Sequence, residues 1–148
     1  MSEIVVRAVR PDERADWEPL WKGYLDFYKM TLPRETYDVT WKRLHDPAEP
    51  MHLLGAYAGG KLLGIVHYLY HRSCWTVGNY CYLQDLFVAK DARKLGLGRA
   101  LIEAVYKEAR SAGASRDHWL THETNTTARA LYDTLADRPG FIQYRKIF

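Results

Sequence analysis

Two glycines one residue apart, Gly96 and Gly98, stand where an apolar strand pattern gives way to a helical one. The N-terminus of a helix carries unpaired N–H groups and a partial positive charge, and glycines there let an anion approach the backbone without meeting a Cβ atom. Arg93, Lys94 and Arg99 add cationic side chains suited to phosphate oxygens. The segment lacks the Gly-Lys-Ser/Thr ending of a nucleoside-triphosphate loop and the third glycine of a dinucleotide fingerprint. It indicates a pyrophosphate site, with a glycine-containing turn and solvated basic residues as the alternative.

Polar side chains interrupt the apolar run YCYLQDLFV at residues 80–88. A central strand rarely accepts a carboxylate without a partner or a task, so Gln84 and Asp85 are candidates for binding an amine, and Asp85 also for relaying a proton. Because successive residues face opposite sides of a sheet, only one of the two is expected to face the substrate directly. A structural Asp85 paired with Arg or Tyr is the alternative. Glu123 is a further candidate base, or else an acid near the N-terminus of a following helix.

The first helical segment is rich in large aromatic side chains. Tyr24 and Tyr28 could line a channel for an amine or flank a cation. The alternative is that these aromatic residues are core, as we expect for Trp17 and Trp21. The substrate-binding residues predicted from the sequence are Tyr24, Tyr28, Gln84, Asp85 and Glu123.

Periodicity and turn residues predict the elements that must position these side chains. Helices are expected over residues 13–29, 34–44, 97–112 and 125–135. Strands are expected over residues 4–9, 51–57, 61–70, 80–88, 118–122 and 141–148. Ala58-Gly59-Gly60 predicts a hairpin between the second and third strands. Strands neighbour each other in the first half and helices cover the faces, so the expected fold class is a mixed α/β (α+β) sheet.

The composition suits one globular domain over residues 1–148, with 47% hydrophobic and 26% charged residues. We expect a cytoplasmic protein, because the sequence has no signal-peptide pattern and no apolar run of the roughly 20 residues that a membrane span needs. Cys74 and Cys81 are expected to be reduced, and neither they nor the six histidines show metal-ligand spacing. The net charge of +3 is mild and its bases are interspersed with acids, so no nucleic-acid partner is predicted.

Two segments carry a family resemblance. Residues 86–102, LFVAKDARKLGLGRALI, resemble motif A of the GNAT superfamily of N-acetyltransferases, in which Arg/Gln-x-x-Gly-x-Gly/Ala follows a strand. Residues 123–141, ETNTTARALYDTLADRPGF, resemble motif B of the same superfamily. The segments WEPLWKGYLDFY (17–28) and YLQDLFV (82–88) are similar to the fungal histone and D-amino-acid N-acetyltransferase branch. The diamine acetyltransferases, which act on spermidine and spermine, are a more distant likeness.

This resemblance implies a GNAT fold, a single mixed and mostly antiparallel sheet in which a central pair of strands splays apart. Phe87 and Val88 would then pair with the pantetheine arm of acetyl-CoA, and the Val88 N–H would stabilise the oxyanion. Tyr132 matches the tyrosine proposed to protonate the CoA sulfur. The alternative for Tyr132 is a core tyrosine with a satisfied hydroxyl. The cofactor-binding residues implied are Phe87, Val88, Arg93, Lys94, Leu95, Gly96, Leu97, Gly98, Arg99, Ala100, Asn125 and Tyr132.

The resemblance implies an enzyme that transfers acetyl from acetyl-CoA to an amine, with Tyr132 and Asp85 as catalytic residues. The acceptor would be a small amine, an amino acid or a protein lysine. Diamine enzymes resemble this chain but carry a glutamate where Gln84 stands, which weakens a polyamine interpretation. Direct transfer without an acyl-enzyme is expected, because the cysteines lack an evident partner and no GxSxG motif occurs.

Two further expectations complete the sequence-based hypothesis. The alternative to an enzyme is a regulatory module that binds CoA or acyl-CoA without turnover. The ending GFIQYRKIF (140–148) would leave a terminal strand edge, and similar fungal enzymes dimerise through this region, so a homodimer is predicted.

Overall fold

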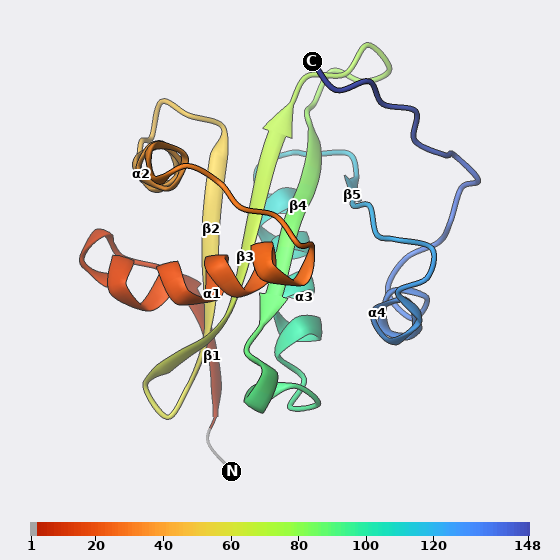
Figure 1. The fold of residues 1–148 in the computed structure, drawn as a ribbon. Helices are drawn as coiled ribbons and strands as arrows, with labels where there is room; N and C mark the ends of the chain where they lie inside the picture. Colours follow the sequence, from red (N-terminus) through yellow and green to blue (C-terminus); the bar gives the residue numbers. More distant parts are fainter. Residues whose placement is uncertain (1–2) are drawn as a thin grey trace.

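The computed structural model describes residues 3–148, and a five-stranded sheet lies at its centre (Figure 1). The strands are β1 (Ile4–Ala8), β2 (Met51–Ala58), β3 (Lys61–His71), β4 (Tyr80–Val88) and β5 (Asp117–His118). They lie side by side in chain order, antiparallel from β1 to β4, whereas β4 and β5 run parallel. This mixed, mostly antiparallel sheet confirms the predicted fold class.

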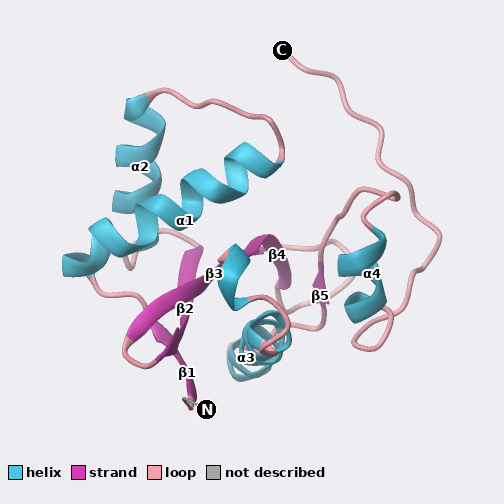
Figure 2. Ribbon diagram, turned by 60° about the horizontal axis from the view of Figure 1, so that its bottom comes forward, coloured by secondary structure: helices cyan, strands magenta, loops and turns pink. Residues whose placement is uncertain are grey.

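Helices cover both faces of the sheet (Figure 2). The helices α1 (Arg14–Phe27) and α2 (Arg34–Leu44) lie on one face, and α3 (Leu97–Ser111) lies on the other. A short 3-10 helix, η1 (Pro11–Glu13), leads into α1, and a second, η2 (Lys90–Ala92), precedes the turn before α3. Within residues 3–148, no helix is long and apolar enough to cross a lipid bilayer.

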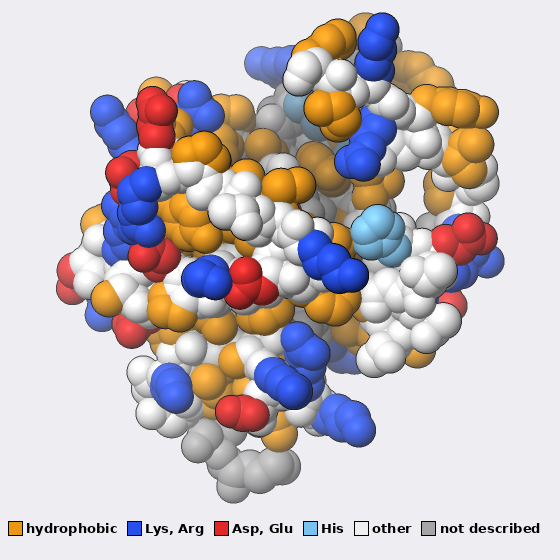
Figure 3. Space-filling model, viewed as in Figure 1, with side chains coloured by type: hydrophobic (Ala, Val, Ile, Leu, Met, Phe, Trp, Pro, Cys, Tyr) orange, Lys and Arg blue, Asp and Glu red, His pale blue; other side chains and the backbone are white. Residues whose placement is uncertain are grey.

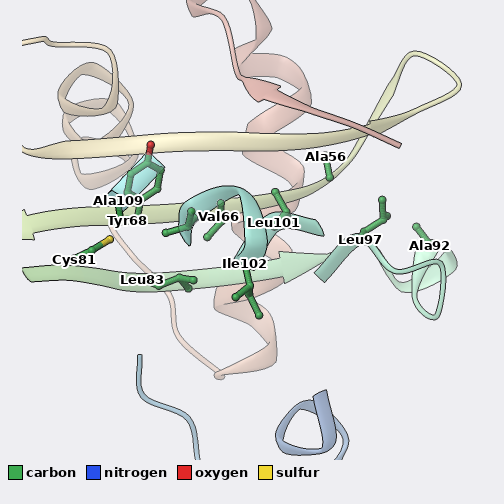
Figure 4. Close-up of a cluster of buried hydrophobic side chains, with 11 residues drawn as sticks. Ala56, Val66, Tyr68, Cys81, Leu83, Ala92, Leu97, Leu101, Ile102 and Ala109 are labelled. Atoms are coloured by element: carbon green, nitrogen blue, oxygen red, sulfur yellow. The ribbon is translucent and has the colours of Figure 1, made fainter. Parts of the chain in front are cut away.

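Each face of the sheet has its own hydrophobic core. On the α3 side, residues spaced by three or four along the helix pack on alternate side chains of the strands, which is the pattern of an amphipathic helix. This α3-side core consists of Ala56, Val66, Tyr68, Cys81, Leu83, Ala92, Leu97, Leu101, Ile102, Val105 and Ala109 (Figure 4). The α1-side core consists of Val9, Trp17, Leu20, Trp21, Leu25, Leu44, Leu53, Tyr57, Leu62 and Ile65. Trp17 and Trp21 are therefore core residues, as expected.

The strands β4 and β5 separate after a short contact. Cys81 pairs with Asp117 and Tyr82 with His118, and beyond these two pairs the β4 edge has no strand neighbour among residues 3–148. The helix α4 (Thr126–Tyr132) lies beyond this opening, away from the rest of the sheet (Figure 1). The splayed pair that the family resemblance implies is thus present, but it lies at the edge of the sheet, because no strand follows β5 in the sheet formed by residues 3–148.

The C-terminal third departs from the sequence-based boundaries. The strand predicted over residues 118–122 is reduced to Asp117–His118, and the helix predicted over residues 125–135 covers only Thr126–Tyr132. The strand predicted over residues 141–148 is wrong, because this segment is irregular and side chains such as Tyr144 are 90% exposed. A strand needs a paired neighbour, and the two-residue β5 gives the end of this chain no edge to extend.

A buried carboxylate fixes the point where α1 begins. Glu13 accepts hydrogen bonds from the two Arg7 Nη atoms at 2.8 and 3.1 Å, from the Arg10 N–H at 2.9 Å and from the Tyr57 hydroxyl at 3.1 Å. These donors, Arg7 first, lower the pKa of Glu13 from 4.5 to about 2 despite its burial. The network joins β1, η1 and β2 directly before α1, the helix that carries Tyr24 and ends at Tyr28.

This network predicts an acid-sensitive contribution to stability. The folded pKa of about 2 lies below the ordinary value of 4.5, so the contribution is complete above pH 4.5 and is lost as the pH falls toward 2. We expect Glu13→Gln to lower the free energy of unfolding by roughly 2–3 kcal/mol at pH 7, and by progressively less below pH 4.5. Urea unfolding across this range measures the difference. Glu35→Gln, at an exposed position of α2, is the control, and a deficit that persists undiminished in acid would contradict the assignment.

Candidate active site

An open pocket lies where the C-terminal end of α1 faces the segment before α4. It has a volume of about 470 Å³ and is lined by Phe27, Tyr28, Lys29, His122, Thr124 and Asn125. The Tyr28 ring lies 5.5 Å from the His122 ring and 4.9 Å from the Tyr24 ring. The two predicted acceptor tyrosines therefore lie together at the C-terminal end of α1.

Asp85 lies close to these tyrosines and is held by a buried histidine. Its Oδ2 is 3.0 Å from His67 Nδ1, and His67 Nε2 accepts the Trp17 indole N–H at 3.1 Å. The side chains of His67 and Asp85 are only 5% and 13% exposed. Burial, followed by the charge of Asp85, raises the pKa of Tyr24 and of Tyr28. Both phenols therefore stay protonated at physiological pH and can donate hydrogen bonds.

The strand β4 bulges next to Asp85. Asp85 pairs with His67, but the next residue of β3 pairs with Leu83, so Gln84 is the extra residue of β4. Leu83 and Leu86, three positions apart, both pack on the α3-side core. The strict alternation predicted through Gln84 and Asp85 is therefore wrong, because a bulge shifts the side-chain pattern by one residue. Gln84 is exposed, whereas Asp85 is held by His67.

Tyr132 ends α4 with a half-buried side chain, and its ring meets Trp119 edge-on at 5.4 Å. Burial, followed by the neighbouring Tyr28, raises the pKa of Tyr132 to about 12. Its hydroxyl makes no hydrogen bond to any other residue in the described part of the chain, whereas the Tyr106 hydroxyl donates to the Leu135 carbonyl at 2.9 Å. Tyr132 is thus not a core tyrosine with a satisfied hydroxyl, and its protonated phenol is free to donate.

The β4 edge presents the backbone of Val88 to the opening. On the other side of β4, the Ala89 N–H donates to the Leu63 carbonyl at 2.8 Å. Because hydrogen-bonded and non-hydrogen-bonded pairs alternate between antiparallel strands, Val88, opposite Gly64, points its N–H and C=O away from β3. By the same alternation the Phe87 backbone bonds to β3, while its side chain packs against the α1-side core. Of the two residues predicted to offer backbone groups, only Val88 directs them to the opening.

The turn before α3 exposes unpaired backbone N–H groups. Gly96 caps α3 in the left-handed conformation, with φ of +85°, and its carbonyl accepts the Ala100 N–H at 3.0 Å. The N–H groups of residues 97–99 have no backbone acceptor within the described chain, as expected for the first turn of a helix. The predicted stretch Leu95–Ala100 therefore offers several donors at one place.

Positive side chains surround this turn. Arg93, Lys94 and Arg99 are all exposed. Arg93 Nε donates to the Val88 carbonyl at 3.3 Å, and Arg99 Nη2 donates to Thr134 Oγ1 at 2.9 Å. In Figure 3, several Lys and Arg side chains gather below α1, at the end of the molecule where Figure 1 places this turn. Free amides and cations together make an anion-binding surface next to the Val88 edge.

Two predicted residues at the start of α4 differ in position. Asn125 lines the pocket, and its Nδ2 donates to Thr121 Oγ1 at 3.3 Å. Glu123 is exposed and, like Asp85, is not among the residues that line the pocket. Among residues 3–148, no group of three or more His, Cys, Asp or Glu side chains could hold a metal ion.

His67 is a polar residue of the site that the sequence analysis missed. It stands alone in the apolar run Leu62–Tyr70, where a single histidine looks like an ordinary core residue. One signal was present, because His67 and Asp85 each interrupt an apolar strand, and strands that follow one another in the chain commonly pair. The bulge that sets these two residues opposite each other is visible only in the structure.

Comparison with known proteins decides the family. Residues 17–136 match the model of the acetyltransferase (GNAT) family. The chain belongs to the GNAT family. A D-amino-acid N-acetyltransferase of Saccharomyces cerevisiae is 37% identical over 98% of this chain and 91% of its own length. A thialysine N-epsilon-acetyltransferase of Caenorhabditis elegans is 34% identical over 91% of this chain and 83% of its own length.

The fold of this GNAT enzyme agrees with solved structures. A ribosomal-protein-alanine N-acetyltransferase from Brucella melitensis biovar Abortus 2308 has a TM-score of 0.82, with 20% identity over 99% of this chain and all of the other. This is a likeness of fold. With these relatives, the family match identifies the protein as an N-acetyltransferase, and the matched residues 17–136 include His67, Asp85, the turn before α3 and Tyr132.

The two glycines of the GNAT turn should respond in opposite ways to alanine. Gly96 needs its φ of +85°, so we expect Gly96→Ala to lower the free energy of unfolding by about 1–2 kcal/mol. A Cβ at Gly98 would meet only Leu131 Cδ2, at an ordinary contact distance of 3.5 Å. Gly98→Ala should therefore raise the free energy of unfolding by up to about 1 kcal/mol. Urea unfolding of both variants measures the contrast. A stabilised Gly96→Ala protein would contradict the left-handed cap.

Proposed function

We propose that this GNAT enzyme takes its acetyl group from acetyl-CoA and transfers it directly to an amine. The observation that carries the proposal is the open β4 edge at Val88, which leads to the unpaired amides at the start of α3. The pantetheine arm is a chain of amides, which complements a free strand edge, and the amides and cations of the turn suit a pyrophosphate. Acetyl-CoA bound there would supply a reactive thioester.

Three groups of this chain would act on the reacting atoms. The Val88 N–H would donate toward the thioester carbonyl oxygen, which gains negative charge as the amine attacks. Tyr132 keeps its proton at neutral pH, because burial raises its pKa to about 12, and would give it to the departing sulfur. The Asp85 carboxylate would hold the ammonium of the acceptor and accept its proton through water.

The proposed acceptor is the amine of a free amino acid or of a close derivative. Two relatives carry names that specify D-amino acids and thialysine as acceptors. Asp85 offers a negative charge to an ammonium, and Lys29, in the pocket lining, offers a positive charge to a carboxylate. Gln84 supplies no second negative charge, which disfavours a polyamine. The exposed Glu123 has a smaller role in this proposal than Asp85.

Direct transfer is supported by the state of the two cysteines. Cys81 is buried, and burial raises the pKa of its thiol, so it is poorly suited to act as a thiolate nucleophile. Cys74 is exposed and lines a separate pocket with His71, Trp75 and Arg116. We therefore assign no covalent stage to either thiol.

A cytoplasmic location of the enzyme stays a prediction.

The competing function is a module that binds CoA or acyl-CoA without turnover. Release of free thiol from acetyl-CoA in the presence of D-alanine, thialysine, spermidine and a lysine peptide separates the two. Turnover with any of these amines, with the product identified by mass spectrometry, excludes the pure binder. Tight binding of CoA in calorimetry without turnover on the panel would favour the binder instead.

The role of Tyr132 leads to a specific prediction. We expect Tyr132→Phe to lower kcat by roughly 10²–10⁴-fold, because it removes the proton donor, with little change in the Kd of acetyl-CoA. Thiol release and calorimetry measure the two quantities. The matched control is Tyr106→Phe, which loses a hydrogen bond to the Leu135 carbonyl outside the site and should retain kcat. Unchanged turnover in Tyr132→Phe would remove this residue from the mechanism.

We also propose that the enzyme is a homodimer. The segment 141–148 leaves several apolar side chains 75% or more exposed, namely Phe141, Ile142, Tyr144, Ile147 and Phe148. A group of exposed apolar side chains in one segment commonly marks an interface between chains. A second copy of the chain would cover it.

Light scattering tests this assembly. The wild-type mass should be about twice the 17.2 kDa of one chain, and the double variant Ile142→Asp/Tyr144→Asp should return to the protomer mass, because charges oppose burial of the segment. Thr134→Asp, at an exposed position before the segment, is a charge control that should remain dimeric. A protomer mass for the wild type would contradict the proposal.

A further inference from the structure

We propose that His67 is a positioning residue for acetyl transfer: its Nδ1–H holds the Asp85 carboxylate toward the acceptor amine, and Trp17 fixes His67 in the tautomer that can do so. The role of Asp85 rests on the proposed function, whereas the tautomer of His67 does not. His67 acts through Asp85 and is not itself expected to touch the substrate.

The hydrogen bonds determine which ring nitrogen of His67 carries the proton. An indole N–H is only a donor, so Trp17 Nε1, at 3.1 Å from His67 Nε2, requires that Nε2 accepts. In the neutral ring the proton is then on Nδ1, which lies 3.0 Å from Asp85 Oδ2 and donates to it. The relay therefore runs from Trp17 through His67 to Asp85.

Within residues 3–148, the surroundings of His67 offer Nε2 a donor and no acceptor. Trp17 has no exposed surface and His67 is 4% exposed. The Trp21 ring meets the His67 ring edge-on, with centroids 4.8 Å apart. An imidazolium at this place would have two donor nitrogens, so it would lose the hydrogen bond from Trp17 and leave a buried donor unsatisfied.

A neutral His67 leaves the charge of Asp85 uncancelled. The groups that face Asp85 are His67 from β3, Tyr24 and Tyr28 from α1, and Tyr82 from β4. Burial, followed by the charge of Asp85, raises the pKa of all three tyrosines, so they stay uncharged. No Lys or Arg side chain among residues 3–148 forms an ion pair with Asp85. The ammonium of the acceptor is then the cation that this carboxylate lacks.

The relay also acts on the shape of β4. His67 and Asp85 are directly opposite, and the register changes at the next position, where Gln84 bulges out. A hydrogen bond across the pair beside the bulge limits the freedom of the bulged strand to slide. Loss of the Nδ1 donor should therefore release the Asp85 side chain and also make the bulged part of β4 more mobile.

Nitrogen-15 NMR of the histidine rings tests the tautomer without any substrate. We expect the full-length wild-type protein at pH 7 to show His67 neutral and protonated on Nδ1, assigned by its absence in His67→Met. In Trp17→Phe the constraint on Nε2 is gone, so we expect the imidazolium to form at a higher pH than in the wild type. A wild-type ring protonated on Nε2, or an imidazolium at pH 7, would overturn the proposal.

Kinetics test the positioning role, with thialysine and D-alanine as acceptors and saturating acetyl-CoA. His67→Met removes both hydrogen bonds, and we expect the acceptor KM to rise roughly tenfold or more, since bonds to charged groups are among the stronger ones. The KM of acetyl-CoA should not change. His67→Asn keeps a donor near the Nδ1 position and should recover part of the loss. In Trp17→Phe the acidic limb of the kcat/KM profile should move to higher pH.

Controls separate positioning from a general loss of structure. His52→Met alters another partly buried histidine, stacked on Tyr68 in β3, and should leave the acceptor KM and the pH profile as in the wild type. If His67→Met fails to fold, the absence of the signal in His67→Asn assigns the ring instead, so the NMR measurement and the Trp17→Phe profile still decide the question. An active wild type whose acceptor KM and pH profile are the same in all His67 and Trp17 variants refutes the positioning role. Absence of thiol release from the wild type would instead refute the proposed function.

Discussion

The separation of β4 from β5 is the constraint on which the rest of the structure depends. A strand edge inside a domain must satisfy its backbone groups, and the β4 edge beyond Tyr82 has no strand to do so among residues 3–148. The fold cannot cover this edge with apolar side chains without losing those hydrogen bonds. It therefore leaves an opening, with α1 on one side and α4 on the other (Figure 2). Val88, the pocket at Tyr28 and the phenol of Tyr132 are arranged around this opening.

The second half of α1 packs closely on β4, because a glycine of the helix faces the sheet there. Gly23 faces the Phe87 ring, and a Cβ atom at Gly23 would lie 2.8 Å from that ring. The Glu13 network sets where the helix begins, and this contact sets how near its second half comes to β4. Between them they place Tyr24 and Tyr28 close to Asp85. The position of the acceptor pocket is thus a consequence of packing on the α1-side core.

Local patterns predicted most elements of the fold. Amphipathic periodicity was sufficient to predict α1 and α3, and Gly59-Gly60 was sufficient to predict the hairpin. Each of these signals depends on neighbours within a few residues of the chain. Spacing also pointed to Gly96, and family resemblance to Tyr132. The bulge at Gln84 and the partnership of His67 with Asp85 were not predictable in this way, since both depend on the register between two strands. Residues 141–148 read as a strand because their composition favours one, but composition does not supply a paired neighbour.

The charges around the opening are divided between its two ends. Arg93, Lys94 and Arg99 lie at the start of α3, and Asp85 lies close to Tyr24 and Tyr28. Tyr24, Tyr28 and Tyr132 have raised pKa values, so they contribute donors without adding charge. In the proposed reaction anionic acetyl-CoA and a cationic amine must each bind at its own end of the site. A cluster of cations at the start of α3 and a carboxylate held by His67 would orient the two substrates, and the hydrogen bond from His67 keeps that carboxylate in place.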